Sequence, residues 1–227
     1  RDSQVMWDAV ERLAFHASRR SVRINPHSAL KRAFDIAFSL TAIIFCAPML
    51  LALYFLVRSD GGPGVFVQPR LGLGGRTFPC FKFRTMAVDA EARLAGLLDA
   101  NPDLRVQWEL SRKLSPDPRV TRFGVFLREK SLDELPQLFN ILRGEMSVVG
   151  PRPIVSEERA QYGPDFAFYM SARPGLTGLW QVSGRSDLSY PDRVKLDVAY
   201  VETWTFWKDL KIVLRTFGVV AGGRGAR

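Results

Sequence analysis

The chain has 227 residues, a formal net charge of +9 and 47% hydrophobic residues, enough for one domain or for one domain with a membrane element. Its two histidines, His16 and His27, leave little material for a serine–histidine–aspartate triad, a histidine general base or a histidine-ligated metal. The two cysteines, Cys46 and Cys80, exclude a cysteine-rich zinc module and suit a reducing compartment. The positive charge predicts an anionic partner, such as phosphates, anionic lipid or nucleic acid.

Residues 1–30 form a basic segment whose apolar residues approximate helical spacing. We expect an amphipathic linker or juxtamembrane helix, and the pattern leaves open whether this helix is exposed or lies on a membrane surface. The first residue is arginine, so we expect a trimmed or partial chain with further sequence upstream.

Residues 31–58 form the most apolar segment, with no charged residue from Ile36 to Val57. As a straight helix this stretch would reach roughly the 30 Å needed to span a bilayer. Pro48 falls near its middle, and basic residues flank both ends instead of one. These features suit a re-entrant membrane helix that enters and leaves by one face, and a kinked span stays open. Asp35 at the start is expensive in lipid, which predicts a partner in Lys31, Arg32 or the folded domain.

Residues 59–227 are expected to form the main folded domain, an α+β fold that is mostly helical with a small β element. The β-prone pieces at 64–68 and 77–83, punctuated by glycine and proline, predict a hairpin or small sheet. Helices are expected within 87–114, with a break at Asn101–Asp103, and on both sides of the sequence SLDELPQ. A rigid loop is expected at 149–153 and a loop with a short strand at 173–185.

The last segment, residues 189–220, is predicted to be helical. Trp207, Leu210, Leu214 and Phe217 form one stripe, and basic side chains lie off that stripe. This pattern is typical of an amphipathic helix in a membrane interface, and a helix packed on its own domain is an equally good interpretation.

SLDELPQ, residues 131–137, places two carboxylates side by side in a basic chain. Ser131 and Glu134 have the spacing of a capping box, and Asp133 could itself cap a helix with Pro136 in the first turn. In this interpretation the two carboxylates only stabilise a helix end.

The surroundings of the pair support a chemical interpretation as well. Arg128 precedes it, and Arg152 follows in a stiff GPRP loop; arginines bind phosphate through bidentate hydrogen bonds. Adjacent carboxylates suit Mg²⁺, which completes its shell with phosphate oxygens and water. A carboxylate kept ionised by a helix N-terminus and by arginines needs no general base to act as a nucleophile. The residue types therefore indicate phosphoryl transfer through an aspartyl intermediate, and spacing alone leaves capping open.

Long, ordered motifs carry a family resemblance from about Lys31 to the end of the chain. They are KRAFD, GGPGVFVQPRLGLGGRTFPCFKFRTM, DPRVTRFGVFLREKSLDELPQLFNILRGEMSVVGPRP, RPGLTGLWQVSGR and YVETWTFWKDLKIVLRTF. The chain resembles the bacterial sugar transferases, the monotopic polyprenyl-phosphate phosphoglycosyl transferases. Many members have Ser-Pro in the membrane segment where this chain has Ala47-Pro48, so a hydroxyl that could satisfy a freed backbone group is missing.

The resemblance implies transfer of a sugar 1-phosphate from a UDP-sugar to undecaprenyl phosphate, with release of UMP, as the first step of O-antigen, lipopolysaccharide, capsule or exopolysaccharide synthesis. It implies a covalent intermediate on Asp133 and Mg²⁺ held by Asp133 and Glu134. Arg128 and Arg152 would neutralise phosphate charge. The motifs further suggest four residues that contact substrate or phosphate: Arg70, Lys82, Arg185 and Asp209. TFPCFKFRTM and the stretch from NPD to SPDPRVT are most similar to undecaprenyl-phosphate galactose phosphotransferases, and glucose 1-phosphate or an N-acetylated sugar phosphate stays open.

The implied location is the cytoplasmic face of the bacterial inner membrane, in contact with its lipid, with extra upstream membrane helices and a homodimer as open possibilities. A non-catalytic membrane scaffold for polysaccharide assembly would also explain an anchor and a basic face. A nucleic-acid binder is disfavoured, because no recognition motif is visible and the aromatic residues cluster with apolar ones.

Overall fold

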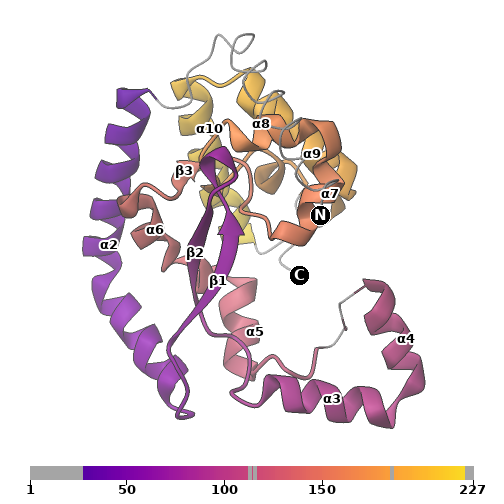
Figure 1. Cartoon of the computed structure of the whole chain (residues 1–227). Helices are drawn as coiled ribbons and strands as arrows, with labels where there is room; N and C mark the ends of the chain where they lie inside the picture. Colours follow the sequence, from indigo (N-terminus) through magenta and orange to yellow (C-terminus); the bar gives the residue numbers. More distant parts are fainter. Residues whose placement is uncertain (1–27, 112–113, 115–116, 185–186, 223–227) are drawn as a thin grey trace.

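The computed structural model describes residues 28–111, 114, 117–184 and 187–222 (Figure 1). The expected amphipathic segment at 1–30 therefore lies almost wholly outside the described residues. The described part is α+β, mostly helical with two small sheets, which confirms the predicted fold class.

Helix α2 (Ala29–Arg58) is the longest element, and it is continuous through Pro48 (Figure 1). Ser28 caps its start by accepting a hydrogen bond from the backbone N–H of Lys31 at 3.1 Å. Figure 1 shows a bend along its length, as expected for a helix that contains proline. Among the described residues, α2 is the one helix long and apolar enough to cross a membrane by length and composition.

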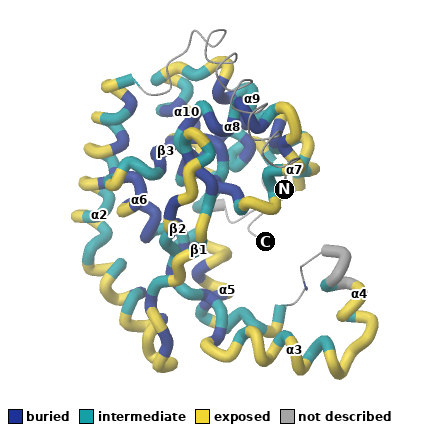
Figure 2. Tube along the Cα trace, viewed as in Figure 1, coloured by how far each residue is buried: buried dark blue, intermediate teal, exposed yellow. Residues whose placement is uncertain are grey.

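One face of α2 lies along the rest of the domain, and the other is exposed (Figure 2). Lys31 and Asp35 in its first half and Leu53 and Val57 in its second half are all buried. The opposite face exposes large apolar side chains, of which Phe45 is 84% exposed. Both ends of the apolar helix thus contact the same folded body, which makes α2 a candidate monotopic membrane-associated helix.

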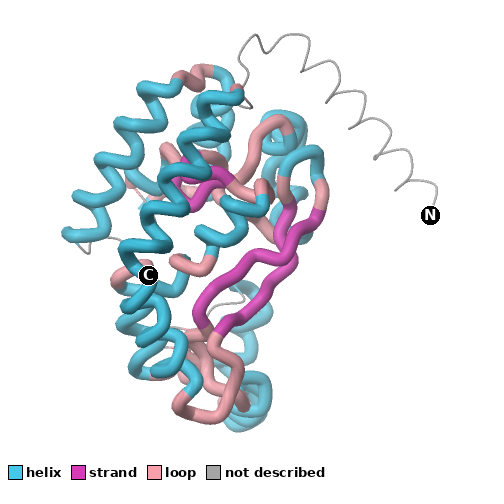
Figure 3. The backbone as a smooth tube through the Cα atoms, turned by 90° about the vertical axis from the view of Figure 1, so that its left-hand side faces the viewer, coloured by secondary structure: helices cyan, strands magenta, loops and turns pink. Residues whose placement is uncertain are grey.

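The predicted hairpin is confirmed. Strands β1 (Val65–Leu71) and β2 (Thr77–Phe83) pair antiparallel with Gln68 opposite Cys80. Figure 3 shows this hairpin beside a second, shorter sheet among helices. That sheet pairs β3 (Ser147–Val149) in parallel with β4 (Gly175–Thr177).

The helices predicted within 87–114 and on both sides of SLDELPQ are confirmed, whereas the two short helices between residues 159 and 170 were not predicted. α3 (Ala90–Ala100) and α4 (Pro102–Ser111) are separated at Asn101, and they project from the body as an arm (Figure 1). The remaining helices are α5 (Arg122–Glu129), α6 (Gln137–Arg143), α7 (Arg159–Tyr162), α8 (Phe166–Met170), α9 (Tyr190–Glu202) and α10 (Phe206–Gly222).

The main apolar core joins β2, α6, β3 and the last two helices. Leu138 and Ile141 of α6 pack there with Val149 of β3, Tyr200 of α9 and Ile212 of α10, all almost fully buried. This core fixes the hairpin against α6, and so it places the residues of both elements around one pocket.

The final segment is two helices, α9 and α10, divided at residues 203–205. In α10 the predicted stripe faces outward, with Trp207 70%, Leu214 64% and Phe217 64% exposed. The other face, including Ile212 and Val213, is buried. The prediction of a helix packed on its own domain is therefore confirmed, and the membrane-interface interpretation of the exposed stripe stays a prediction.

Candidate active site

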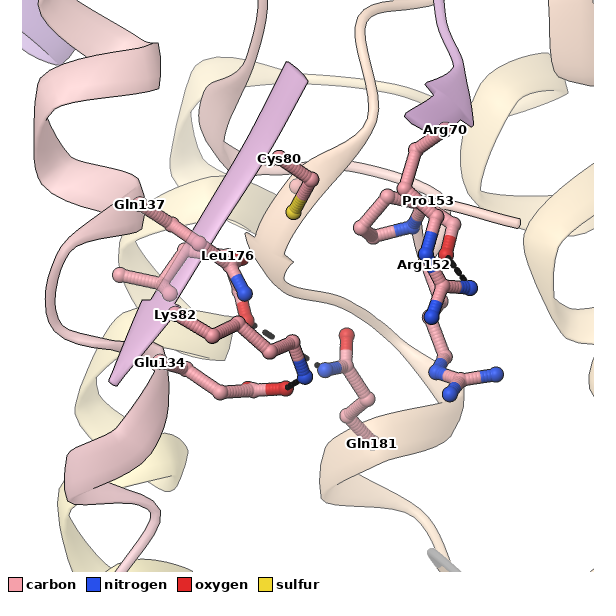
Figure 4. A pocket seen from close by; sticks show the side chains of 10 residues that line it. Arg70, Cys80, Lys82, Glu134, Gln137, Arg152, Pro153, Leu176 and Gln181 are labelled. Carbon is pink, nitrogen blue, oxygen red and sulfur yellow. Dashed lines mark hydrogen bonds and ion pairs between the residues drawn. The ribbon is translucent and has the colours of Figure 1, made fainter. Parts of the chain in front are cut away.

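The two strands of the hairpin and the loops facing it enclose a pocket (Figure 4). Cys80 and Lys82 of β2 point to the same side because they are two residues apart in a strand. The lining residues are Arg70, Cys80, Lys82, Glu134, Gln137, Arg152, Pro153, Gly175, Leu176 and Gln181. Four predicted site residues, Arg70, Lys82, Glu134 and Arg152, are thus brought together from three distant parts of the chain.

The Asp-Glu pair lies in a short 3₁₀ turn, Leu132–Glu134, and not in a helix cap. Ser131 is left-handed, with φ of 55°, and its side chain makes no capping hydrogen bond. Helix α6 begins at Gln137 with Pro136 at the N-cap position. The structure therefore does not support the capping interpretation.

Lys82 connects the two carboxylates to the pocket. Its Nζ donates to Glu134 Oε1 at 2.7 Å, and it lies 3.9 Å from Asp133 Oδ2. Asp133 is only 9% exposed and is not among the lining residues, whereas the next residue, Glu134, lines the pocket. A phosphate held by Lys82 would therefore lie beside both carboxylates.

The two carboxylates differ in acidity. Burial, with a smaller contribution from the charge of Glu134, raises the pKa of Asp133 to about 6 against the opposing charges of Lys82 and Arg128. Burial acts on Glu134 too, but the charge and hydrogen bond of Lys82 hold the pKa of Glu134 below its ordinary value. The expectation that its surroundings favour ionised Asp133 is therefore corrected, because burial outweighs the nearby cations. Asp133 is the more basic partner, yet it is largely ionised at neutral pH.

Two arginines form the opposite side of the pocket from the Lys82–Glu134 pair (Figure 4). Arg70 donates to the carbonyl of Pro153 at 3.1 Å, and its guanidinium lies 3.6 Å from Glu158. Arg152 lies 3.5 Å from the other oxygen of Glu158. Glu158 thus holds the two guanidinium groups near each other. Both arginines line the pocket, where they could bind an anion such as a phosphate.

The loop that carries Arg152 is held rigidly against β4. The backbone N–H of Gly175 donates to the carbonyl of Pro151 at 2.7 Å, and Gly150 N–H donates to Thr177 at 2.9 Å. A Cβ on Gly150 would lie 2.3 Å from the carbonyl oxygen of Arg173, so only glycine fits this close approach. The predicted rigid loop is confirmed, and its rigidity comes from the strand pairing as well as from proline.

Other predicted site residues lie outside the pocket lining. Arg128 donates through Nε to Thr85 Oγ1 at 2.9 Å and acts on Asp133 by its charge alone. Arg185 lies outside the described residues. Asp209 is fully buried and accepts hydrogen bonds from Lys31 at 2.6 Å and from Tyr200 at 2.7 Å. The expectation that Asp209 contacts substrate is corrected, since it is an internal partner that joins α10 to α2.

Sequence reasoning missed six lining residues, of which three have a polar or thiol side chain: Cys80, Gln137 and Gln181. Gln137 was visible as the last residue of SLDELPQ, three positions after Glu134, a spacing that repeats on one face of a helical turn. Gln181 carried no signal in the sequence, because its approach to β2 depends on the β3–β4 pairing.

The carboxylates suit a magnesium ion shared with a substrate. Among the described residues, no group of three or more His, Cys, Asp or Glu side chains could hold a metal by itself. Asp133 and Glu134 supply adjacent hard oxygen ligands, and Mg²⁺ commonly uses one or two protein carboxylates with substrate phosphates. The two carboxylates fit an ion of this kind, but they are too few to coordinate a metal without oxygen ligands from a substrate or water.

The family model described as bacterial sugar transferase matches residues 26–223. The chain belongs to this family. This family member is similar to undecaprenyl-phosphate galactose phosphotransferase of Salmonella typhimurium, with 46% identity over 215 residues that cover 95% of this chain and 44% of that protein. It is similar to exopolysaccharide production protein ExoY of Sinorhizobium fredii, at 46% identity over 94% of this chain and 95% of that protein.

A third relative, UDP-glucose:undecaprenyl-phosphate glucose-1-phosphate transferase of Caulobacter vibrioides, is 41% identical over 82% of this chain and 67% of that protein. The chain spans less than half the length of the Salmonella relative. The match therefore covers the domain that holds the dyad and its pocket.

Proposed function

We propose that this protein transfers a sugar 1-phosphate, galactose 1-phosphate in the first instance, from a UDP-sugar to undecaprenyl phosphate. The observation that carries the proposal is the meeting of Glu134, Lys82 and two arginines at one pocket, with Asp133 Oδ2 3.9 Å from Lys82 Nζ. The Salmonella relative is named for galactose and the Caulobacter relative for glucose, so glucose 1-phosphate is the alternative.

The first half-reaction uses Asp133 as the nucleophile. A carboxylate oxygen of Asp133 forms a bond to the phosphorus that bears the sugar, and the bond from that phosphorus to the bridging oxygen breaks. UMP leaves with the bridging electron pair, and the sugar phosphate stays on Asp133 as an acyl phosphate. Lys82 and Arg152 would stabilise the charge on the diphosphate oxygens. Asp133 and Glu134 would hold Mg²⁺, which when bound would neutralise further diphosphate charge.

The second half-reaction regenerates the enzyme. A phosphate oxygen of undecaprenyl phosphate attacks the same phosphorus, the bond to Asp133 breaks, and a lipid-linked diphosphate sugar forms. A buried carboxylate is a suitable leaving group here, because Lys82 is close enough to stabilise its returning charge. This product would begin O-antigen, capsule or exopolysaccharide synthesis.

The lipid acceptor requires the site to lie at a membrane surface. We propose that the exposed apolar face of α2 enters the lipid from the cytoplasmic side and leaves by the same side. The exposed stripe of Trp207, Leu214 and Phe217 on α10 supports this placement, because aromatic and apolar residues with a basic border favour the interface.

Intact-mass analysis tests the covalent mechanism. Purified protein is incubated with UDP-galactose and Mg²⁺ without lipid acceptor, and the adduct is mapped by peptide. One hexose phosphate on the peptide that contains Asp133 is expected, and Asp133→Asn should form none. An adduct only with UDP-glucose would keep the mechanism and change the sugar. Absence of an adduct and of UMP release with every donor, even with undecaprenyl phosphate, would favour a non-catalytic scaffold.

A further inference from the structure

Two amide side chains in the pocket carry polar atoms that the described residues leave unsatisfied. Gln137 is 1% exposed, and its Nε2 has no hydrogen-bond partner within the described part of the chain. Gln181 donates through Nε2 to the carbonyl of Leu176 at 3.3 Å, and this bond leaves its buried Oε1 unpartnered among the described residues. Buried polar groups in native proteins are nearly always paired with protein, water or ligand.

The two unpartnered atoms require opposite kinds of hydrogen-bond partner. Gln137 Nε2 is a donor and requires an acceptor, whereas Gln181 Oε1 is an acceptor and requires a donor. Phosphate oxygens only accept at neutral pH, so a diphosphate can satisfy Gln137 but not Gln181. A hydroxyl both donates and accepts, and a ring with several hydroxyls can satisfy both amides.

The charged residues and the amide of Gln181 occupy different parts of the pocket. In Figure 4 the side chain of Gln181 lies between the Lys82–Glu134 pair and Arg152. The cations on both sides suit phosphates, and the neutral amide between them suits an uncharged part of the same ligand. Gln137 lies three residues after Glu134, about one helical turn, and both line the pocket. The uncharged part of the ligand that contacts Gln137 would therefore lie close to the reacting phosphorus.

We propose that Gln137 and Gln181 form a subsite for the hydroxyl groups of the donor sugar nucleotide, and that the glycosyl ring supplies them. This inference rests on the proposed function. The glycosyl ring is bonded to the phosphate that Asp133 attacks, whereas the ribose belongs to the leaving UMP. The subsite would thus contribute to the choice of sugar.

Binding measurements on the full chain test the subsite without turnover. Asp133→Asn removes the nucleophile, and Gln137→Met or Gln181→Met is added to it, since methionine keeps the length and removes the hydrogen bonds. Titration calorimetry with UDP-galactose, UDP-glucose and UDP gives each affinity. We expect each Met variant to weaken UDP-galactose binding on the order of tenfold and UDP binding less than about twofold.

A matched control is Gln161→Met, because Gln161 is exposed on α7 and outside the pocket lining. Thermal melting separates the subsite from a structural role. Replacing a buried, unpartnered amide by methionine should leave the melting temperature unchanged or higher, as is common for binding residues. Should a Met variant fail to fold, Gln181→Asn shortens the reach but keeps the amide, and it should weaken UDP-galactose binding in the same direction.

The outcomes are distinct. Equal weakening of UDP and UDP-galactose would assign the hydroxyls to the ribose and overturn the glycosyl assignment. Unchanged affinities for all three ligands would show that water fills the subsite and would overturn the proposal. UMP release with undecaprenyl phosphate is measured separately with intact Asp133, so loss of the proposed function is seen independently. A wild-type chain that binds no UDP-sugar would overturn both.

Discussion

Replacing Asp133 by asparagine should abolish the covalent adduct and at the same time stabilise the fold at neutral pH. The folded-state pKa of Asp133 is about 6, against an ordinary value of 3.8, because burial and Glu134 disfavour its charge. The folded state therefore prefers neutral Asp133, and stability is lost as the pH rises through the folded pKa. About two pKa units correspond to roughly 2–3 kcal/mol at pH 7.5, which neutral asparagine would recover.

The assay is thermal melting of both proteins in the same detergent at several pH values. A gain of 2–3 kcal/mol corresponds to roughly 4–12 °C for a chain of this size. The difference should shrink as the pH falls through 6 and vanish below about 4, where Asp133 is neutral in both states.

Asp117→Asn is the control of opposite sign. Its hydrogen bonds to Arg119 hold the pKa of Asp117 below its ordinary value, so this variant should lose stability at neutral pH. If Asp133→Asn melts below the wild type at pH 7.5, or if its gain does not depend on pH, the burial argument is wrong.

Four further predictions concern the reaction, the core and the membrane. Adduct formation should fall roughly tenfold from pH 7 to pH 5 as Asp133 is protonated, and a pH-independent rate would contradict the pKa of about 6. Lys82→Met should slow adduct formation on the order of 10²-fold and move the pH profile upward, because a charge that lowers the pKa of Asp133 is lost; an unshifted profile would argue against this role. Lys31→Met should destabilise the chain by about 3–5 kcal/mol in denaturant titration, because it leaves the buried carboxylate of Asp209 without its lysine counter-charge, and wild-type stability would refute this. Phe217→Ser should weaken sedimentation with anionic vesicles about tenfold without lowering the melting temperature, and unchanged sedimentation would remove α10 from the interface.

Local patterns were sufficient to predict most elements of this fold. The hairpin follows from β-prone segments between glycines and prolines, and the break at Asn101 follows from the NPD sequence. The outward stripe of α10 followed from helical spacing, but its packed face did not. Ile212 and Val213 make both faces of α10 apolar, so periodicity could not decide which one is buried.

The site shows where sequence reasoning stops. Lys82 and Arg152 were found from motifs, and the structure places both at the pocket. Asp209 was misassigned because its partner, Lys31, is 178 positions away and spacing cannot reveal such a pair. The pKa of Asp133 was given the wrong sign, since burial is a property of the packed fold and the flanking arginines were the only visible influence.

The buried pair of Lys31 and Asp209 explains how the two apolar helices and the GPRP loop are held together. Lys31 of α2 contacts Asp209 of α10 at 2.6 Å and also donates to the carbonyl of Val149 at 3.0 Å. Val149 ends β3, and the GPRP loop with Arg152 follows directly. A lipid-borne phosphate and a soluble donor must reach the same Asp133 in the proposed reaction, so the depth of the pocket relative to the lipid is decisive. In that reaction the Lys31–Asp209 pair would set the depth, because it fixes both apolar helices to the start of this loop.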